Sequence, residues 1–184
     1  MKHRILNSEL QTVFIIFLLA ITLISPIAYA KKNINPDILT LPSKPIPLSE
    51  SNMNEKALTQ WLSDALKACF IFDKKNYPDL LKANRQYFTV VGWKQYEAYL
   101  KTSDTLNQVL NKNYALSIEL AKVKITSKGL FKKRYAWKAM VPAMLYFQSP
   151  SSMISHSLKI YLKIIREPTY LNPNGVGINR VIVK

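Results

Sequence analysis

Apolar residues recur every three or four positions in the first half of segment 54–184 and at every second position in its second half. The first spacing is typical of helices with one buried face, and the second is typical of strands with one buried face. This spacing predicts three helices. The first covers 54–72, with Cys69 on its apolar stripe; the second begins at Asn76, with Pro78 in its first turn; the third covers 89–100, and a short further turn follows Asp104.

After Asn113 the period of two predicts an antiparallel meander. The apolar parity shifts near Ala121, which suggests a bulge, and Ser127-Lys128-Gly129 reads as a turn. Trp137 lies at the centre of the longest apolar face, whereas Pro142 points to the other side. The expected strands are 116–125, 131–147, 158–164 and 176–183.

Helices followed by a meander predict an α+β fold. We expect the N-terminal helices to pack on one face of a curved, roughly four-stranded antiparallel sheet. Segment 54–184 contains no repeat and is large enough to bury a core of its own, so it is interpreted as one domain.

Residues 1–30 read as a signal peptide. Lys2 and Arg4 precede an apolar core, and the core ends before the motif Ala28-Tyr29-Ala30, which suits signal peptidase. The alternative is an uncleaved membrane anchor, because 13–30 is a run of 18 residues without a charge. In both cases the rest of the chain would lie outside the cytosol. Residues 31–53 hold four prolines and predict an extended linker.

Without Lys2, Arg4 and Glu9 the chain keeps 24 basic and 10 acidic residues, a formal charge of +14. Such a surface favours anionic partners, although a coding bias toward lysine would give the same composition. Cys69 is the only cysteine, so no intramolecular disulfide can form. We interpret it as a small buried side chain rather than a reactive thiol, because no second cysteine or nearby histidine would activate it.

Basic residues gather around one predicted hairpin, and they form the candidate interaction edge: Lys128, Lys132, Lys133 and Arg134. This edge could dock an acidic protein or lipid surface, or bind nucleic acid. The neighbouring aromatic residues share the apolar face of their strand, which favours a place in the core over a base-stacking surface. Nucleic acid is therefore disfavoured as a partner.

An enzyme with an apolar pocket is the remaining alternative. General acid–base chemistry needs an inward-facing carboxylate or histidine, and the strand half offers only Glu119, Glu167 and His156. His156 shares the parity of Leu158, so it could point inward, but no paired carboxylate accompanies it. We therefore assign no catalytic residue, no metal ligand and no cofactor.

A series of short motifs runs in order along residues 54–182. They are Trp61, Phe70-x-Phe72, Asn76-Tyr77, Tyr87-Phe88-Thr89-x-x-Gly92-Trp93, Arg134-Tyr135-Ala136-Trp137, Pro142, Arg166-x-Pro168-Thr169 and Asn172-Pro173-x-Gly175-x-Gly177-Ile178. This series resembles the periplasmic domain of the IcmL/DotI family. The resemblance implies an inner-membrane component of type IVB secretion machines of the Dot/Icm kind, with a cystatin-like or ketosteroid-isomerase-like roll.

The chain departs from that family in having only about eleven residues before its apolar stretch. We therefore expect a non-enzymatic interaction module in the periplasm, acting as a soluble accessory or a paralogue of the membrane subunit; an anchored form is the alternative. The expected partners are periplasmic domains of secretion subunits, including related IcmL-like proteins. Self-association and transient contact with a membrane surface are further options.

Overall fold

The computed structural model describes residues 45–184. The predicted leader and most of the predicted linker lie outside this range. Among the described residues, no helix combines the length and the apolar character needed to cross a bilayer. The helical elements are α2 (Glu55–Phe70), α3 (Tyr77–Asn84), α4 (Val90–Thr102), the 3₁₀ turn η2 (Arg85–Tyr87) and the π-helical turn η3 (Asn107–Asn111).

Side-chain caps fix the starts of the two longer helices. The Asn54 side chain accepts a hydrogen bond from the Ala57 amide at 2.8 Å, and Thr89 accepts one from the Gly92 amide at 3.1 Å. Pro78 lies in the first turn of α3, where its missing amide hydrogen has no intrahelical partner to lose. The three predicted helices are confirmed.

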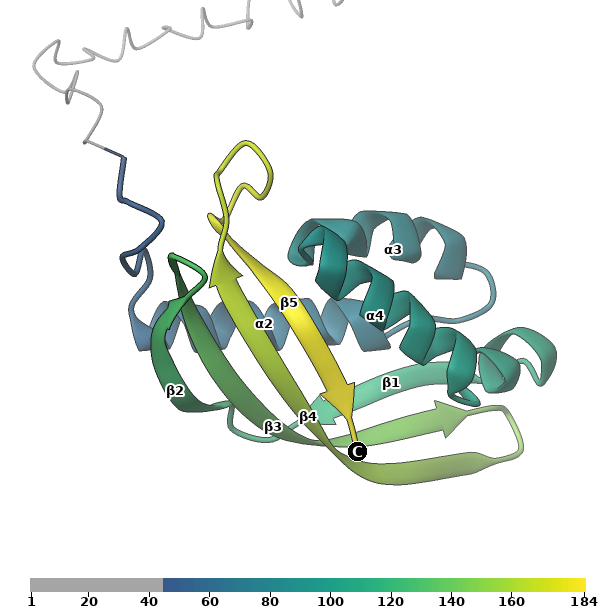
Figure 1. Cartoon of the computed structure of the whole chain (residues 1–184). Helices are drawn as coiled ribbons and strands as arrows, with labels where there is room; N and C mark the ends of the chain where they lie inside the picture. Colours follow the sequence, from purple (N-terminus) through teal and green to yellow (C-terminus); the bar gives the residue numbers. More distant parts are fainter. Residues whose placement is uncertain (1–44) are drawn as a thin grey trace, which may run out of the picture. The chain divides into compact units, whose positions relative to one another are not determined.

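The strands form one antiparallel sheet in which β3 is central. On one side β3 pairs first with β2 and then with β1, and on the other side it pairs with β4, which pairs with β5 (Figure 1). The α+β class and the helix-covered sheet are therefore confirmed. The bounds are β1 (Ala115–Leu120), β2 (Lys124–Phe131), β3 (Arg134–Gln148), β4 (Met153–Arg166) and β5 (Val176–Val183).

The first hairpin differs from the prediction. Ser127 and Gly129 lie within β2, and the turn falls at Lys132 and Lys133, whose φ angles are 50° and 65°. Two successive left-handed residues are typical of a two-residue hairpin turn, but such turns normally carry Asn or Gly, so two lysines gave no signal. The parity shift near Ala121 is a break between β1 and β2, which gives five strands where about four were expected.

Pro142 occupies the point of β3 where β1 ends and β2 begins. Its carbonyl accepts a hydrogen bond from the Ala121 amide at 2.9 Å. The last β1 pair is Leu120 with Ala143, and the first β2 pair is Lys124 with Met140. The backbone groups of Pro142 point to the β1/β2 side, where no strand residue stands opposite, so a residue without an amide hydrogen is tolerated here.

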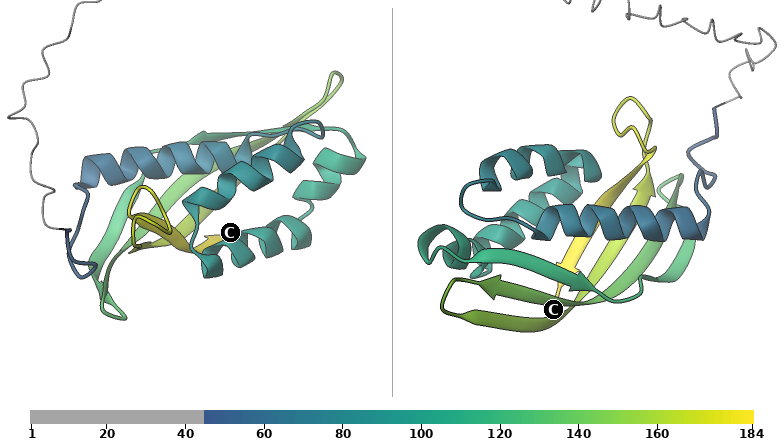
Figure 2. Two further views of the ribbon diagram at one scale, coloured as in Figure 1. Left: turned by 90° about the horizontal axis from the view of Figure 1, so that it is seen from above. Right: turned by 180° about the vertical axis from the view of Figure 1, so that it is seen from behind.

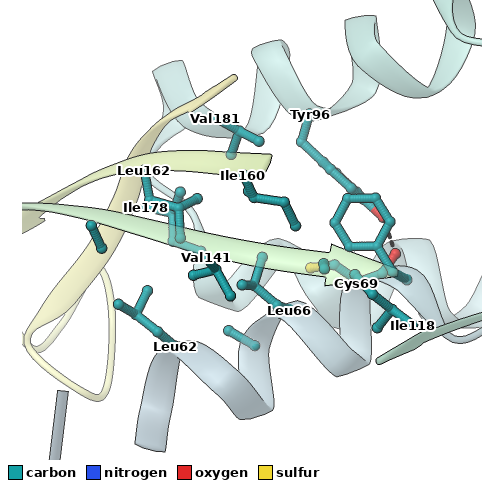
Figure 3. Packing of buried hydrophobic residues seen from close by; sticks show 14 of the residues in the cluster. Leu62, Leu66, Cys69, Tyr96, Ile118, Val141, Ile160, Leu162, Ile178 and Val181 are labelled. Atoms are coloured by element: carbon teal, nitrogen blue, oxygen red, sulfur yellow. Dashed lines mark hydrogen bonds between the residues drawn. The ribbon is translucent and has the colours of Figure 1, made fainter. Parts of the chain in front are cut away.

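Helix α2 covers one face of the sheet, which we call the inner face. Strands β3 to β5 pass in front of α2 in Figure 1, and α2 passes in front of them when the molecule is seen from behind (Figure 2). Trp137 on the inner face is 4% exposed, as its central position predicted. Leu62 and Leu66 of α2 lie against Val141 in the same layer (Figure 3).

Helix α4 docks at the β5 edge of the sheet through a close backbone contact. The Thr89 amide donates to the Ile178 carbonyl at 3.1 Å, and a Cβ placed on Gly92 would lie 1.8 Å from that oxygen. Tyr96, one turn further along α4, is buried and donates its hydroxyl hydrogen to the Cys69 carbonyl (Figure 3). Only glycine can occupy position 92 at this separation of helix and strand.

Candidate interaction surface

The structure separates the four residues of the predicted interaction edge into two groups. Lys132 and Lys133 form the exposed tip of the β2–β3 hairpin, and Lys128 is exposed on β2, opposite Trp137 in the strand register. Arg134 instead pairs with Glu167, which follows β4, with 2.9 Å between Nη1 and Oε1. The predicted edge counted Arg134 with the three lysines; the structure shows its guanidinium ion-paired, and its part in the edge stays a prediction.

The face of the sheet opposite α2, which we call the outer face, carries a row of cations that the sequence analysis missed. Lys138 on β3 stands directly opposite Lys163 on β4, and Lys163 stands opposite Arg180 on β5. Neighbouring strands lie about 4.8 Å apart, so these are adjacent like charges, which destabilise a sheet unless an anion compensates them. We call these three residues the cationic row.

The next row on the outer face is mainly apolar. Met140, Tyr161 and Ile182 are cross-strand neighbours, with Lys124 of β2 beside Met140. Tyr161 is 39% exposed. Beyond this row, Lys159 and Lys184 form a backbone-paired position, and the Lys184 ammonium lies 6.0 Å from the centre of the Tyr161 ring. Cations therefore border the apolar row on both sides.

The outer face lacks compensating acids. Strands β2 to β5 contain no Asp or Glu at all. The acids that flank them are already engaged: Glu167 pairs with Arg134, and Glu119 of β1 accepts a hydrogen bond from the Tyr146 hydroxyl at 3.0 Å. In residues 45–184 no second ion pair occurs, so the six outer-face cations have no acidic partner there; they are Lys124, Lys138, Lys159, Lys163, Arg180 and Lys184.

Two shallow hollows meet at the cationic row. One, of about 230 Å³, is lined by all three of its members together with Tyr161 and Ile182. The other, of about 370 Å³, lies on the β2 side, where Gly129 has no side chain to fill it, and it also reaches Lys138 and Lys163. The Lys163 ammonium lies 3.9 Å from the centre of the Phe131 ring. This cation–π contact fixes the position of that charge between the two hollows.

A further hollow of about 380 Å³ lies where the start of α4 meets the β4–β5 connection. The exposed side chains of Val90, Val91 and Leu171 line it, and the Arg134–Glu167 pair closes one side. Glu167 is the only buried carboxylate in the part of the chain that the structure describes, and Arg134 neutralises it. This arrangement leaves no free acid there for proton transfer.

Arg166 is a buried cation that holds the chain before α2 onto the domain. Its guanidinium donates to the carbonyls of Ile46 at 3.0 Å, Glu50 at 3.1 Å and Gly175 at 2.6 Å. Burial lowers its pKa from the ordinary value. Two of the motifs noted in the sequence, at Arg166 and Gly175, meet at this contact.

The domain boundary at residue 54 stays a prediction, but residues 46–50 contact the domain.

His156 and Cys69 are the remaining residues that the sequence analysis considered for chemistry. His156 is exposed near the β3–β4 hairpin, with its ring 5.8 Å from that of Phe147. Cys69 is buried, and burial raises the pKa of its thiol. Within 45–184, no three His, Cys, Asp or Glu side chains gather as a metal site.

Comparison with solved structures places the fold in a known class. The chain is similar to the VirB8 protein of Agrobacterium tumefaciens, with a TM-score of 0.51 and 9% identity, covering 73% of this chain and 96% of that one. It is also similar to an IcmL-like type IV secretion protein from Legionella pneumophila, with a TM-score of 0.65 and 21% identity, covering 73% and 94%. The fold is thus a VirB8-like α+β domain of the NTF2-like kind.

A higher similarity identifies the family. The periplasmic domain of DotI superimposes with a TM-score of 0.70 at 29% identity, covering 73% of this chain and 98% of that one. The family described as "Type-IV b secretion system, inner-membrane complex component" matches residues 26–184. The chain therefore belongs to the DotI/IcmL family, as its motifs suggested. No curated protein sequence matches it.

Proposed function

We propose that the described domain acts by binding other subunits, as a non-enzymatic periplasmic module of a type IVb secretion inner-membrane complex. The family match over residues 26–184 carries this proposal. The arrangement of the buried acid supports it, because Glu167 is tied to Arg134 and no second carboxylate is buried among residues 45–184. With its one buried carboxylate neutralised, the described domain is better suited to recognition than to acid–base chemistry.

The hairpin tip is the part that would meet an acidic subunit. Lys132 and Lys133 are exposed, and neither is ion-paired among the described residues. Charges at such a projecting turn accelerate association with an oppositely charged surface more than they add affinity. Related IcmL-like subunits, including a second copy of this chain, are the candidate partners.

Affinity purification from a secretion-competent host tests the proposal. The wild-type chain should recover secretion subunits at low salt, and Lys132→Glu with Lys133→Glu should reduce that recovery. The matched control reverses Lys74 and Lys75, another exposed adjacent pair, and should leave recovery unchanged. If the wild type recovers no secretion subunit, the assignment to the apparatus is wrong; equal loss in both double variants would show that only net charge matters.

We further propose that the chain is exported and cleaved after Ala30, which would give a mature protein that starts at Lys31. Intact-mass measurement of the exported protein tests this directly. A full-length mass, together with resistance to alkaline extraction from membranes, would instead establish the anchored form.

A further inference from the structure

We propose that the outer face of β2–β5 binds the anionic phospholipid surface of the membrane beside which the complex is built. The six cations of this face form a two-dimensional array over β2 to β5 and the residue that follows β5. Two rows of cations flank the apolar row of Met140, Tyr161 and Ile182, and Lys124 stands at the end of that row. The headgroups of a membrane surface form a plane, so they can neutralise cations on all of these strands at once. A single extended peptide could contact only the cations that lie along its own direction.

The types of side chain also fit a lipid surface. Five of the six cations are lysines, which act on phosphates as point charges, whereas paired recognition of carboxylates is the usual role of arginine. Tyr161 presents an exposed ring with a polar end between the cation rows, an arrangement suited to a headgroup region.

A sheet face offers few main-chain groups to a peptide, because the strands use them for one another. Peptides that add to sheets do so at an edge, where free amides and carbonyls remain. Lys138, Lys159 and Lys163 lie on β3 and β4, which have a paired strand on each side, and α4 covers the β5 edge at the Thr89–Ile178 contact. At these central positions an acidic protein segment would gain side-chain contacts only, which favours lipid as the occupant.

The row of like charges has a stability consequence. Lys138, Lys163 and Arg180 repel one another in the free protein, and headgroup phosphates relieve that repulsion. Replacing the row with neutral glutamines should therefore weaken lipid binding without lowering the thermal midpoint. If the row served only to stabilise the fold, its replacement would lower the thermal midpoint and leave lipid binding unchanged.

The experiment uses the exported full chain with a Ser127→Cys substitution, labelled with an environment-sensitive dye. Ser127 is exposed and stands opposite Lys138, while native Cys69 is buried and should not react. The pure phosphatidylcholine vesicles control for binding through residues 1–30, because an apolar anchor would insert into both kinds of vesicle. Vesicles of phosphatidylglycerol with phosphatidylcholine should shift the emission to the blue at 0.15 M salt, and pure phosphatidylcholine vesicles should not.

Changing Lys138, Lys163 and Arg180 to glutamine should weaken this response about 100-fold, since each surface cation contributes about fivefold. The matched control changes Lys67, Lys94 and Lys101 on α2 and α4, all exposed, and should stay within about twofold of wild type. Lys138→Gln alone should cost about fivefold, which keeps the test valid if the triple variant folds poorly.

Three results would overturn the proposal. Equal emission shifts with neutral and anionic vesicles would remove the role of charge. Equal losses in the two triple variants would show a net-charge effect without a specific face. A dye response to polyaspartate, with none to anionic vesicles, would assign the face to an acidic protein. The vesicle assay contains no secretion subunit, so its failure leaves the proposed role in the complex to be judged by the purification experiment.

Discussion

Replacing Gly92 with alanine tests the packing on which the fold depends. The new Cβ would lie 1.8 Å from the Ile178 carbonyl oxygen, and real contacts of this kind begin at about 3.0 Å. Backbone atoms lie on both sides of this contact, so no side chain can rotate away. Helix α4 must therefore withdraw from β5 by about 1.2 Å.

The cost follows from what that withdrawal disturbs. Forced overpacking costs about 1–3 kcal/mol, and loss of the Thr89–Ile178 backbone hydrogen bond, 3.1 Å long, about 1 kcal/mol. Disturbing the stacked rings of Phe88 and Tyr96, whose centroids are 5.0 Å apart, would cost about a further 0.5–1.5 kcal/mol. Alanine returns about 0.5–1 kcal/mol through its better helix propensity. The net expectation is a destabilisation of about 3 kcal/mol.

Urea unfolding followed by tryptophan fluorescence measures this change. For a slope near 2 kcal/mol per molar urea, the midpoint should fall by about 1.5 M. Val91→Ala is the control, because Val91 is 54% exposed and adjacent, and it should cost less than about 0.5 kcal/mol. A Gly92→Ala protein as stable as wild type would mean that α4 can shift along β5 without loss, and the argument from close approach would fail.

Three further predictions concern stability. Trp137→Ala should cost about 3–5 kcal/mol in urea unfolding and Lys132→Ala less than about 0.5 kcal/mol, and equal effects would mean that the inner face is misassigned. Lys133→Gly should stabilise the protein by about 0.5–1 kcal/mol and so raise the urea midpoint, because φ is 65° at this position and glycine adopts that angle without strain. A lower midpoint would mean that the turn does not place residue 133 in the left-handed region. Burial raises the pKa of Cys69 and Tyr96 above the ordinary values of 9.0 and 10.0, so the folded chain retains protons that the unfolded chain releases. The contribution of these two groups to stability should be level below about pH 9. Above the ordinary pKa of each group it should fall by up to about 1.4 kcal/mol per pH unit, and Cys69→Ala should remove its share of this slope in urea titrations at pH 8–11.

The helical half could be predicted closely because its signals are local. The start of α2 was expected at Asn54, and the structure shows the cap there. Thr89 was expected to open the third helix, and it caps α4. The bounds of β5 were also predicted, because the residue types of 172–175, Asn-Pro-Asn-Gly, are typical of a turn that precedes a strand. The position of the β2–β3 turn was predicted wrongly because it has no local signal. Lys132 and Lys133 adopt left-handed conformations, but neither is a residue type that usually marks them.

The outer face lay beyond sequence reasoning for a different physical reason. Lys138, Lys163 and Arg180 are far apart in the chain, and only the strand register makes them neighbours. A bulge between Lys163 and Ile164 in the β4–β5 pairing shifts that register by one residue, so that Arg180 rather than Asn179 completes the row. Counting lysines by sequence proximity instead selected the hairpin, where Arg134 proved to be paired with Glu167. A charge count can therefore predict that this domain meets an anion, but the sheet register determines which face would do so.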